Sequence, residues 1–231
     1  MRVTKVLLVG GKYMIRINRR SLVTASAALA VAALTLSVVP AQAFAPKSEV
    51  GVSSSEIKLG VTLPMTGAAS PGYNKVPAAM KAYFDYVNAN GGVNGRKITL
   101  VVKDDQYIPT TAVAKANELI LRDKVFALVG TLGTASTKAI SASTQLAKRG
   151  IPSLFVNTGF SGFADVKKYK TTYAMLPSYV MEAKIMAEYI KDNFAGKTIG
   201  LVYQDDDFGS DALAGFKSAG ITFAAKVGYA S

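Results

Sequence analysis

Small residues and hydroxyl side chains gather after a short apolar run near the middle of the chain. The run Val125–Val129 ends at Gly130, and a helix-like stretch starts a few residues later. The small and hydroxyl residues that follow the run are Thr131, Gly133, Thr134 and Ser136. Free backbone N–H groups at such a helix start, together with the hydroxyls, can bind a carboxylate or a phosphate. The alternative is an ordinary strand-to-helix turn in which Thr134 or Ser136 is the N-cap.

A second loop of the same kind follows the next predicted strand. Ile151–Val156 predicts a strand, and it leads into a segment of glycine and hydroxyl residues, 157–162. The carboxyl ends of parallel strands share one edge of a sheet, so the two loops lie side by side if their strands are neighbours. The pair favours a ligand site at this edge more than either loop does alone.

Two groups of adjacent acids could suggest acid–base or metal chemistry. Asp104 and Asp105 end a predicted strand, where successive side chains point to opposite faces. We therefore expect them to cap or solvate the strand end. Asp205–Asp207 are contiguous, whereas calcium loops alternate their ligands. We expect a solvated loop there, or one carboxylate that faces a ligand amine.

The composition argues against an enzyme. The chain contains no Cys and no His, so it has no thiolate metal site and lacks the usual general base near neutral pH. It also lacks a GxGxxG motif, a P-loop lysine and a GxSxG elbow. These observations favour binding over catalysis, and we expect no cofactor and no metal site.

The elements that position these residues follow from hydropathy. Strands are expected at Ile57–Leu63, Lys97–Lys103, Val125–Val129 and Ile151–Val156. Helices between them complete four βα units, which predict an α/β fold with a parallel sheet flanked by helices. The buried face of the first helix is expected to comprise Val76, Ala79, Met80, Tyr83, Phe84 and Val87. The inward residues of the helix that runs to about Lys148 are expected to be Ala139, Ile140, Ser143 and Leu146 or Ala147.

The remaining part of the chain predicts the beginning of a second set of units. An extended segment, 171–178, precedes a helix, a strand at Thr198–Tyr203, a helix to about Ala219 and an apolar stretch. A single unit plus a strand cannot close a core, so we expect this set to be truncated at Ser231. Inward residues of its first helix are expected to be Ala183, Met186, Ala187 and Ile190.

The net charge of +12 is concentrated at the start of the chain. Six of the 27 basic residues precede residue 21, which leaves 21 basic against 15 acidic residues. The others are scattered apart from Lys167, Lys168 and Lys170, without alternating aromatics, so we expect no nucleic-acid partner.

The first 43 residues have the pattern of a signal peptide. Residues 1–20 are basic, Ser21–Val39 is apolar, and a short A-x-A segment ends at Ala43. We expect cleavage after Ala43 and export to the periplasm or cell exterior. A retained membrane anchor is the alternative, because the run could just span a bilayer. The pair Arg19–Arg20 leaves twin-arginine export open beside the general route, and Met14 is an alternative start.

Several segments taken together resemble one family. EIKLGVTLPMTG, NGGVNGRKI with the VVKDD strand, KVFALVGTLGTAST, IPSLFVNTGFSGF and LVYQDDDFGSDAL are similar to periplasmic solute-binding proteins of branched-chain amino acid ABC transporters. The resemblance implies the class I periplasmic-binding-protein fold, with two lobes that close on a ligand. It implies lobe 1 at residues 56–176 and a partial lobe 2 at 177–231, after a signal peptide at 1–43 and a linker at 44–55.

The resemblance also implies a set of ligand-binding positions. The ligand's carboxylate and amine would be held by the loops after the third and fourth strands. Tyr73 would cover the ligand side chain, and Phe208 would be the aromatic of lobe 2. The loop positions carried over are Gly133, Thr134, Ala135, Thr158, Gly159 and Phe160.

The implied function is transport. The chain would bind a small amino acid such as Leu, Ile or Val and deliver it to an ABC membrane permease, as a monomer. The alternatives are a ligand-sensing receptor domain of the same fold, or binding of an amide, a urea-like compound or an aromatic acid.

Overall fold

The computed structural model describes residues 49–230 of the chain. The predicted signal peptide, its cleavage after Ala43 and the retained-anchor alternative lie outside the described residues. Within residues 49–230, no helix has both the length and the apolar character needed to cross a membrane.

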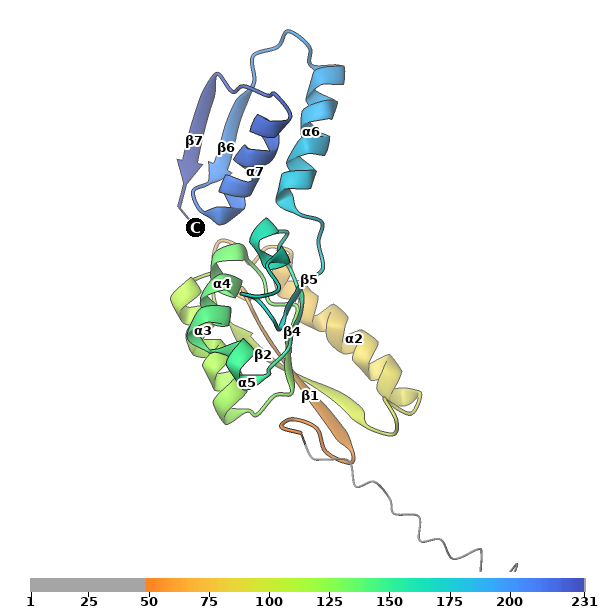
Figure 1. Ribbon diagram of the computed structural model, residues 1–231. Helices are drawn as coiled ribbons and strands as arrows, with labels where there is room; N and C mark the ends of the chain where they lie inside the picture. Colours follow the sequence, from red (N-terminus) through yellow and green to blue (C-terminus); the bar gives the residue numbers. More distant parts are fainter. Residues whose placement is uncertain (1–48, 231) are drawn as a thin grey trace, which may run out of the picture. The chain divides into compact units, whose positions relative to one another are not determined.

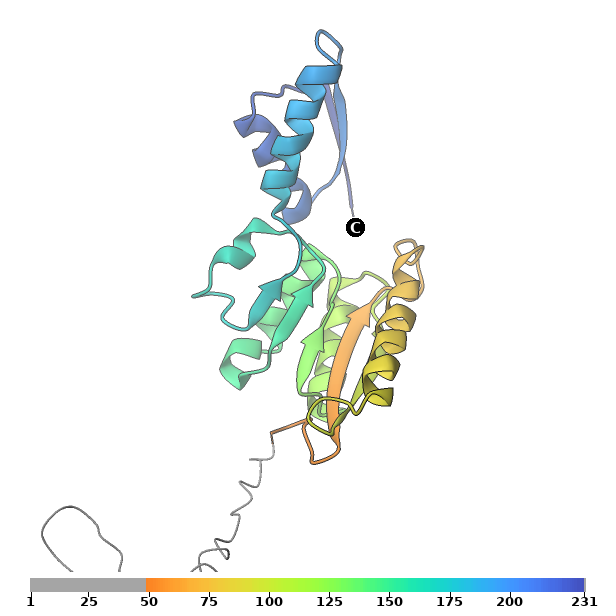
Figure 2. The same cartoon turned by 90° about the vertical axis from the view of Figure 1, so that its right-hand side faces the viewer.

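Five parallel strands form the first sheet, in the order β2-β1-β3-β4-β5 (Figures 1 and 2). Their bounds are β1 Glu56–Leu63, β2 Lys97–Asp104, β3 Ala127–Val129, β4 Ser153–Val156 and β5 Thr172–Ala174. The four predicted strands and their parallel pairing are confirmed, and the extended segment before residue 178 supplies the fifth strand. Because β3 and β4 are neighbours, the two hydroxyl-rich loops start from adjacent strands.

Helices flank this sheet on both faces (Figure 1). The longer ones are α2 Val76–Ala89, α3 Pro109–Asn117 and α4 Thr134–Ser143. The shorter elements are η1 Tyr73–Lys75, the π-helical turn η2 Glu118–Arg122, α5 Leu146–Arg149 and η3 Ser161–Ala164. Pro109 suits the first turn of α3, because its missing N–H would have no partner inside the helix.

A second, two-stranded parallel sheet follows in the chain. It consists of β6 Gly200–Gln204 and β7 Ala225–Tyr229, paired from Gly200 opposite Ala225 to Gln204 opposite Tyr229. The helices α6 Tyr179–Asn193 and α7 Asp207–Ser218 pack on each other through Ala183, Ala187 and Phe216. The five-stranded sheet lies within 56–176 and the two-stranded sheet within 177–231; the division into lobes at that boundary stays a prediction.

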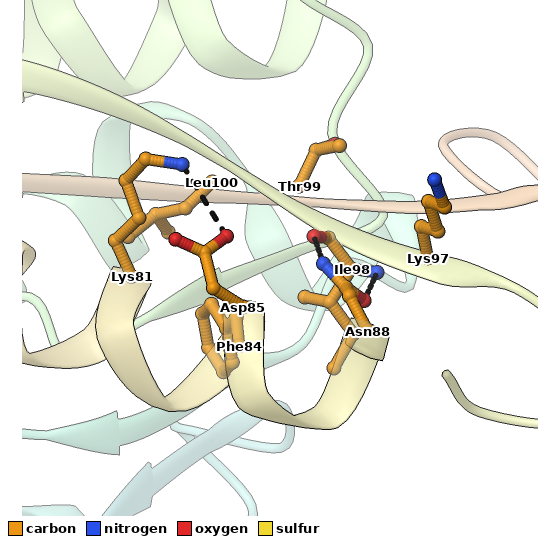
Figure 3. Close-up of a pocket in the computed structure, with 8 residues that line it drawn as sticks. All are labelled: Lys81, Phe84, Asp85, Asn88, Lys97, Ile98, Thr99 and Leu100. Atoms are coloured by element: carbon orange, nitrogen blue, oxygen red, sulfur yellow. Dashed lines mark hydrogen bonds and ion pairs between the residues drawn. The ribbon is translucent and has the colours of Figure 1, made fainter. Parts of the chain in front are cut away.

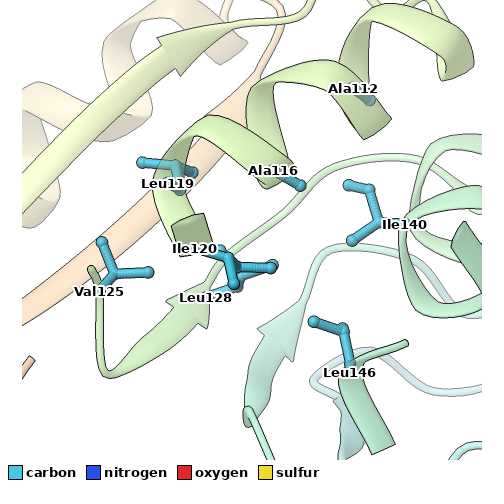
Figure 4. Packing of buried hydrophobic residues seen from close by; sticks show 8 residues of the cluster. All are labelled: Ala112, Ala116, Leu119, Ile120, Val125, Leu128, Ile140 and Leu146. Atoms are coloured by element: carbon cyan, nitrogen blue, oxygen red, sulfur yellow. The ribbon is translucent and has the colours of Figure 1, made fainter. Parts of the chain in front are cut away.

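The main hydrophobic core lies between the first sheet and the helices on one of its faces (Figure 4). It joins α3 and η2 to β3, α4 and α5. Its buried members are Ala112, Ala116, Leu119, Ile120, Val125, Leu128, Ile140 and Leu146. This cluster fixes α4, and therefore the loop that precedes it.

Some predicted buried faces are wrong in detail. Ala79 and Tyr83 are exposed, because α2 faces the sheet with the stripe formed by Val76, Met80, Phe84 and Val87 instead.

The helix expected to run to Lys148 is interrupted at Gln145, whose φ of 56° ends α4 and starts α5. Ser143 lies on the exposed side of α4, and beyond the break Leu146 is buried whereas Ala147 is exposed. Met186 on α6 is also exposed, since α6 packs on α7 through its alanines.

Two leucines of the same π-helical turn allow a matched test of this core. Leu119 is fully buried in the cluster, whereas Leu121 is 47% exposed. We expect Leu119→Ala to lower the free energy of unfolding by about 2–5 kcal/mol, because it leaves a cavity in a packed core. Leu121→Ala should change it by less than about 1 kcal/mol. Urea unfolding of both variants measures the difference, and equal losses would contradict this packing.

Candidate functional site

The loops after β3 and β4 remain paired beyond the ends of their strands. Asn157 donates its N–H to the carbonyl of Thr131 at 2.8 Å, and Gly133 donates its N–H to the carbonyl of Asn157 at 3.3 Å. An isolated parallel bridge joins Leu132 to Asn157. The expectation that the two loops lie side by side is therefore confirmed.

Two buried hydroxyls join these loops. The Oγ1 atoms of Thr134 and Thr158 lie 2.7 Å apart, and both residues are buried. Thr158 Oγ1 also accepts the N–H of Phe160 at 3.2 Å. The bond between the hydroxyls holds the first residue of α4 against the loop that follows β4.

The N-terminus of α4 has no side-chain cap. The N-cap position is Gly133, with φ 94° and ψ 143°, and within residues 49–230 no side chain caps this helix end. Neither Thr134 nor Ser136 is thus the N-cap, which corrects that part of the ordinary-turn alternative. Gly130 and Gly133, however, have positive φ angles of 70° and 94°, as that alternative expected of turn-forming glycines. The first N–H groups of α4, which include that of Ala135, remain suited to an anion.

Two further hydroxyls close to this helix end are buried. The Oγ1 atoms of Thr131 and Thr137 have no hydrogen-bond partner among the described residues. Thr131 directly follows β3, and Thr137 lies one turn into α4. The region is therefore rich in donors and contains no acidic side chain from these two loops.

Tyr107 completes the site, and the sequence analysis did not identify it. A Cβ atom built on Gly133 would lie 2.7 Å from Cε2 of Tyr107, so the ring lies directly against this glycine. The Tyr107 N–H donates to Oδ1 of Asp105 at 2.9 Å, and its φ is 64°. The signal that could have found it is its place in the loop after β2, although β2 is separated from β3 by β1.

Burial raises the pKa of Tyr107. Asp206, Tyr179 and Tyr73 raise it further, and hydrogen bonding to Gln204 opposes them. Tyr107 therefore stays a neutral phenol near neutral pH. These groups come from η1, α6, the end of β6 and the N-cap of α7.

The remaining predicted positions differ in their surroundings. Tyr73 is exposed at the start of η1. The carbonyl of Gly159 accepts the N–H of Tyr179 at 2.8 Å, and a Cβ on Gly159 would lie 2.3 Å from the carbonyl oxygen of Pro177. Phe160 packs edge-on against Phe163, with ring centres 5.2 Å apart.

Phe208 contacts Tyr179, the first residue of α6. Its ring centre lies 4.5 Å from that of Tyr179, which also contacts Gly159. The structure thus brings Gly133, Thr134, Ala135 and Thr158 together and links Gly159 to Phe208 through Tyr179.

The two acidic groups have structural roles. Asp104 accepts N–H groups of Met65 and Gln106, at 2.9 and 3.0 Å, and the hydroxyl of Thr66 at 2.6 Å. Asp105 is fully buried and accepts the Thr62 hydroxyl at 2.7 Å. The two carboxylates therefore bind different partners, as the strand geometry predicted, and both hold loops in place.

In the run Asp205–Asp207, two carboxylates are engaged. Asp206 is the N-cap of α7 and accepts the N–H of Phe208 at 2.8 Å and the side-chain amide of Gln204 at 2.7 Å. Asp207 forms an ion pair with Lys138 of α4. Within the described part of the chain, no group of three acidic side chains is placed to hold a metal ion.

Two cavities have volumes of about 210 and 220 Å³; the first lies away from this site, and the second borders the predicted positions Gly159 and Phe160. The first is a surface groove between α2 and β2 (Figure 3). There Asn88 binds both the N–H and the carbonyl of Ile98, at 2.7 and 2.8 Å, and Lys81 pairs with Asp85. The second is lined by Phe160, Phe163 and Leu176, among others. Thr99 of the first cavity donates its hydroxyl to Glu56, which lies outside the cavity lining, at 2.7 Å. Neither cavity is lined by Thr134 or Thr158.

Comparisons with known proteins agree with this geometry. Residues 56–229 match the family model described as periplasmic binding protein. An amino acid binding protein of Pseudomonas aeruginosa is 32% identical over 179 residues, which are 72% of this chain and 45% of that protein. A Leu/Ile/Val-binding protein of Rhizobium johnstonii is 27% identical over 187 residues. The match covers 80% of this chain and 48% of that protein.

A solved structure shows the same fold. A substrate-binding periplasmic protein from Ralstonia solanacearum gives a TM-score of 0.68 at 27% identity, and the match covers 76% of this chain and 50% of that chain. The chain thus spans about half the length of the relatives that it matches. The names of these three proteins describe binding, and none is the name of an enzyme.

The contact between Gly133 and Tyr107 yields a stability prediction. We expect Gly133→Ala to lower the free energy of unfolding by about 1–3 kcal/mol from backbone strain, with a further loss from overlap with the ring. Gly150→Ala is the control, because Gly150 also has a positive φ but no atom within 4 Å of its Cβ, and it should cost about 1 kcal/mol. Tyr107→Ala should restore part of the stability lost in Gly133→Ala; no restoration would contradict the contact.

The two neighbouring aspartates should affect acid stability in opposite directions. For Asp104, burial raises the pKa, but hydrogen bonds from Thr66, Gln106 and Met65 outweigh it and lower the pKa overall. Its contribution to stability is therefore present at neutral pH and is lost as the pH falls, and Asp104→Asn should remove that loss. Burial raises the pKa of Asp105, so this residue costs stability as the pH rises above the usual aspartate value.

We compare the change in the free energy of unfolding between about pH 3 and pH 7. Relative to the unmodified chain, Asp105→Asn should make this change more positive, and Asp104→Asn should make it less positive. Thermal unfolding across this pH range measures both slopes. Changes of the same sign in the two variants would contradict the assignment.

Proposed function

Because the chain belongs to the periplasmic binding protein family, we propose that it is the solute-binding component of an ABC transporter and binds a branched-chain amino acid. The proposal concerns the whole protein, of which this chain covers about half by comparison with its relatives. The names of the relatives support an amino acid as the ligand. The predicted signal peptide supports export, and delivery to a membrane permease is part of the same proposal.

The observation that carries the proposal is the uncapped N-terminus of α4 beside the Thr134–Thr158 pair. A ligand carboxylate placed here would accept N–H groups of Thr134 and Ala135 and gain from the helix dipole. The bond between the two hydroxyls fixes them before the ligand arrives. Binding would then need little rearrangement of this loop pair, which favours affinity.

Aromatic residues around this position suit the aliphatic part of the ligand. Tyr107 lies against Gly133, and Tyr179 lies against Gly159. Tyr73 and Tyr179 both raise the pKa of Tyr107. We infer that Tyr73 covers the ligand side chain. Phe208 reaches the site through its contact with Tyr179, and we assign to it a contact from the second lobe.

Phe160 and Gly159 contribute differently in this proposal. The Phe160 N–H is already bonded to Thr158, and its ring packs on Phe163. Phe160 would therefore act by orienting the Thr158 hydroxyl. Gly159 would act by allowing the close approach of Pro177 and Tyr179.

Carboxylate recognition can be tested with a pair of ligands. The labelled chain from Phe44 onward is titrated with L-leucine and, separately, with L-leucinamide, which lacks the carboxylate. We expect leucine to shift the backbone amide resonances of residues 133–136 and 158, and leucinamide to leave them unchanged. Equal shifts with both ligands would contradict carboxylate binding at α4.

Variants of Thr134 test the role of the hydroxyl pair. We expect Thr134→Val to weaken leucine binding by about tenfold, because a net hydrogen bond contributes about 1 kcal/mol or somewhat more. Thr134→Ser should retain most of the affinity, since it keeps the hydroxyl. Calorimetry or the same titration measures both, and a Val variant that binds as well as the Ser variant would overturn this role.

A further inference from the structure

Basic side chains are concentrated just before two adjacent strands of the first sheet. Between Lys124 and Met181 the sequence contains a single acidic residue, Asp165. In this stretch, cations precede both β4 and β5, and all of them are exposed. We name them the basic edge: Lys148, Arg149, Lys167, Lys168 and Lys170.

The pairing of β4 with β5 brings the two basic segments together. Ser153 is the register partner of Thr172, and the Ser153 N–H donates to the carbonyl of Thr171 at 2.7 Å. Arg149 and Lys168 each precede this paired position by four residues. Parallel strands begin at the same edge of a sheet, so the cations share that edge, which is opposite the proposed ligand site.

The segment before β5 holds its lysines in a defined turn. Asp165 Oδ1 accepts the N–H groups of Lys167 and Lys168 at 3.0 and 3.1 Å. Tyr169 is buried against Phe163, with ring centres 4.8 Å apart, and this packing attaches the turn to the protein interior. The only acid of the stretch thus shapes the backbone, and no cation of the basic edge has an ion-pair partner among residues 49–230.

An apolar side chain projects beside these lysines. Val166 is 72% exposed, between Asp165 and Lys167. An exposed apolar residue among lysines suits the boundary of a membrane, where cations meet phosphate groups and apolar groups enter the headgroup layer. Neither of the two cavities is lined by these cations, so a diffuse array of charges fits the basic edge better than a single acidic peptide does.

We propose that the basic edge binds the surface of an anionic phospholipid membrane. This would keep the protein close to the membrane while its ligand site, at the opposite edge of the sheet, stays open to the solvent; delivery to a permease would follow release from the lipid. This proposal goes beyond ligand binding. It rests on the proposed export only for which membrane surface the protein would meet.

A vesicle sedimentation assay tests this proposal. The chain from Phe44 onward is used, because the basic and apolar segment before it would bind lipid by itself, and the described elements lie in the compact unit Ser48–Ser231. The vesicles contain about one third phosphatidylglycerol in phosphatidylcholine, or phosphatidylcholine alone. The test variant carries Gln at all five positions of the basic edge.

A control variant removes the same charge elsewhere. It carries Gln at five exposed lysines outside the basic edge: Lys184, Lys191, Lys197, Lys217 and Lys226. We expect the unmodified chain and the control to bind the anionic vesicles, and the test variant to bind at least about tenfold more weakly. Binding should also fall between low salt and about 0.15 M salt, because salt screens exposed charges.

Three outcomes would overturn the proposal. One is equal weakening in both variants, which would show an effect of net charge alone. Another is equal binding to neutral vesicles. The third is retention on a polyglutamate matrix without vesicle binding, which would assign the basic edge to an acidic protein. Leucine titration of the test variant separates these results from a failure of the proposed ligand binding, since no residue of the basic edge lies in that site.

Discussion

The pairing of β3 with β4 past their carboxyl ends is the constraint on which the candidate site depends. Two backbone hydrogen bonds, through Thr131, Gly133 and Asn157, continue the ladder into the loops. This pairing places Thr134 opposite Thr158, within hydrogen-bond distance. The position of the N-terminus of α4, with its uncapped first N–H groups, and the hydroxyl pair are consequences of this register.

Close approach of backbone and ring then determines which residues can occupy the loops. At Gly133 a positive φ and the Tyr107 ring both exclude a side chain, and at Gly159 the carbonyl of Pro177 does so. Tyr107 is itself held by its N–H bond to Asp105, which is fixed by Thr62 of β1. A chain of contacts therefore runs from the middle of the sheet, through a buried carboxylate, to the glycine that caps α4.

Much of this arrangement could be predicted from the sequence, because apolar periodicity and turn residues act locally. The runs at Ile57–Leu63 and Ile151–Val156 are strands, and the order of units implied a parallel sheet. What could not be predicted depends on non-local packing. Tyr83 has the spacing of a buried residue but lies beside the contact stripe of α2, and Gln145 breaks a helix that its neighbours would continue. Tyr107 reaches Gly133 only because its loop is folded by Asp105, which no local pattern reveals.

The chemistry of the site follows from which charges are already engaged. The loops after β3 and β4 present N–H and O–H donors, so they suit an anion and offer little to a cation. Two carboxylates of the second set of elements are already engaged. Asp206 accepts from the start of α7 and from Gln204, and Asp211 accepts the N–H and the hydroxyl of Ser161 in the loop after β4. An amino acid has an amine as well as a carboxylate, and a buried ammonium needs acceptors. In the proposed function these loops would therefore supply a carboxylate subsite, and selectivity for an amino acid over a simple carboxylic acid would have to come from acceptors that these loops do not provide.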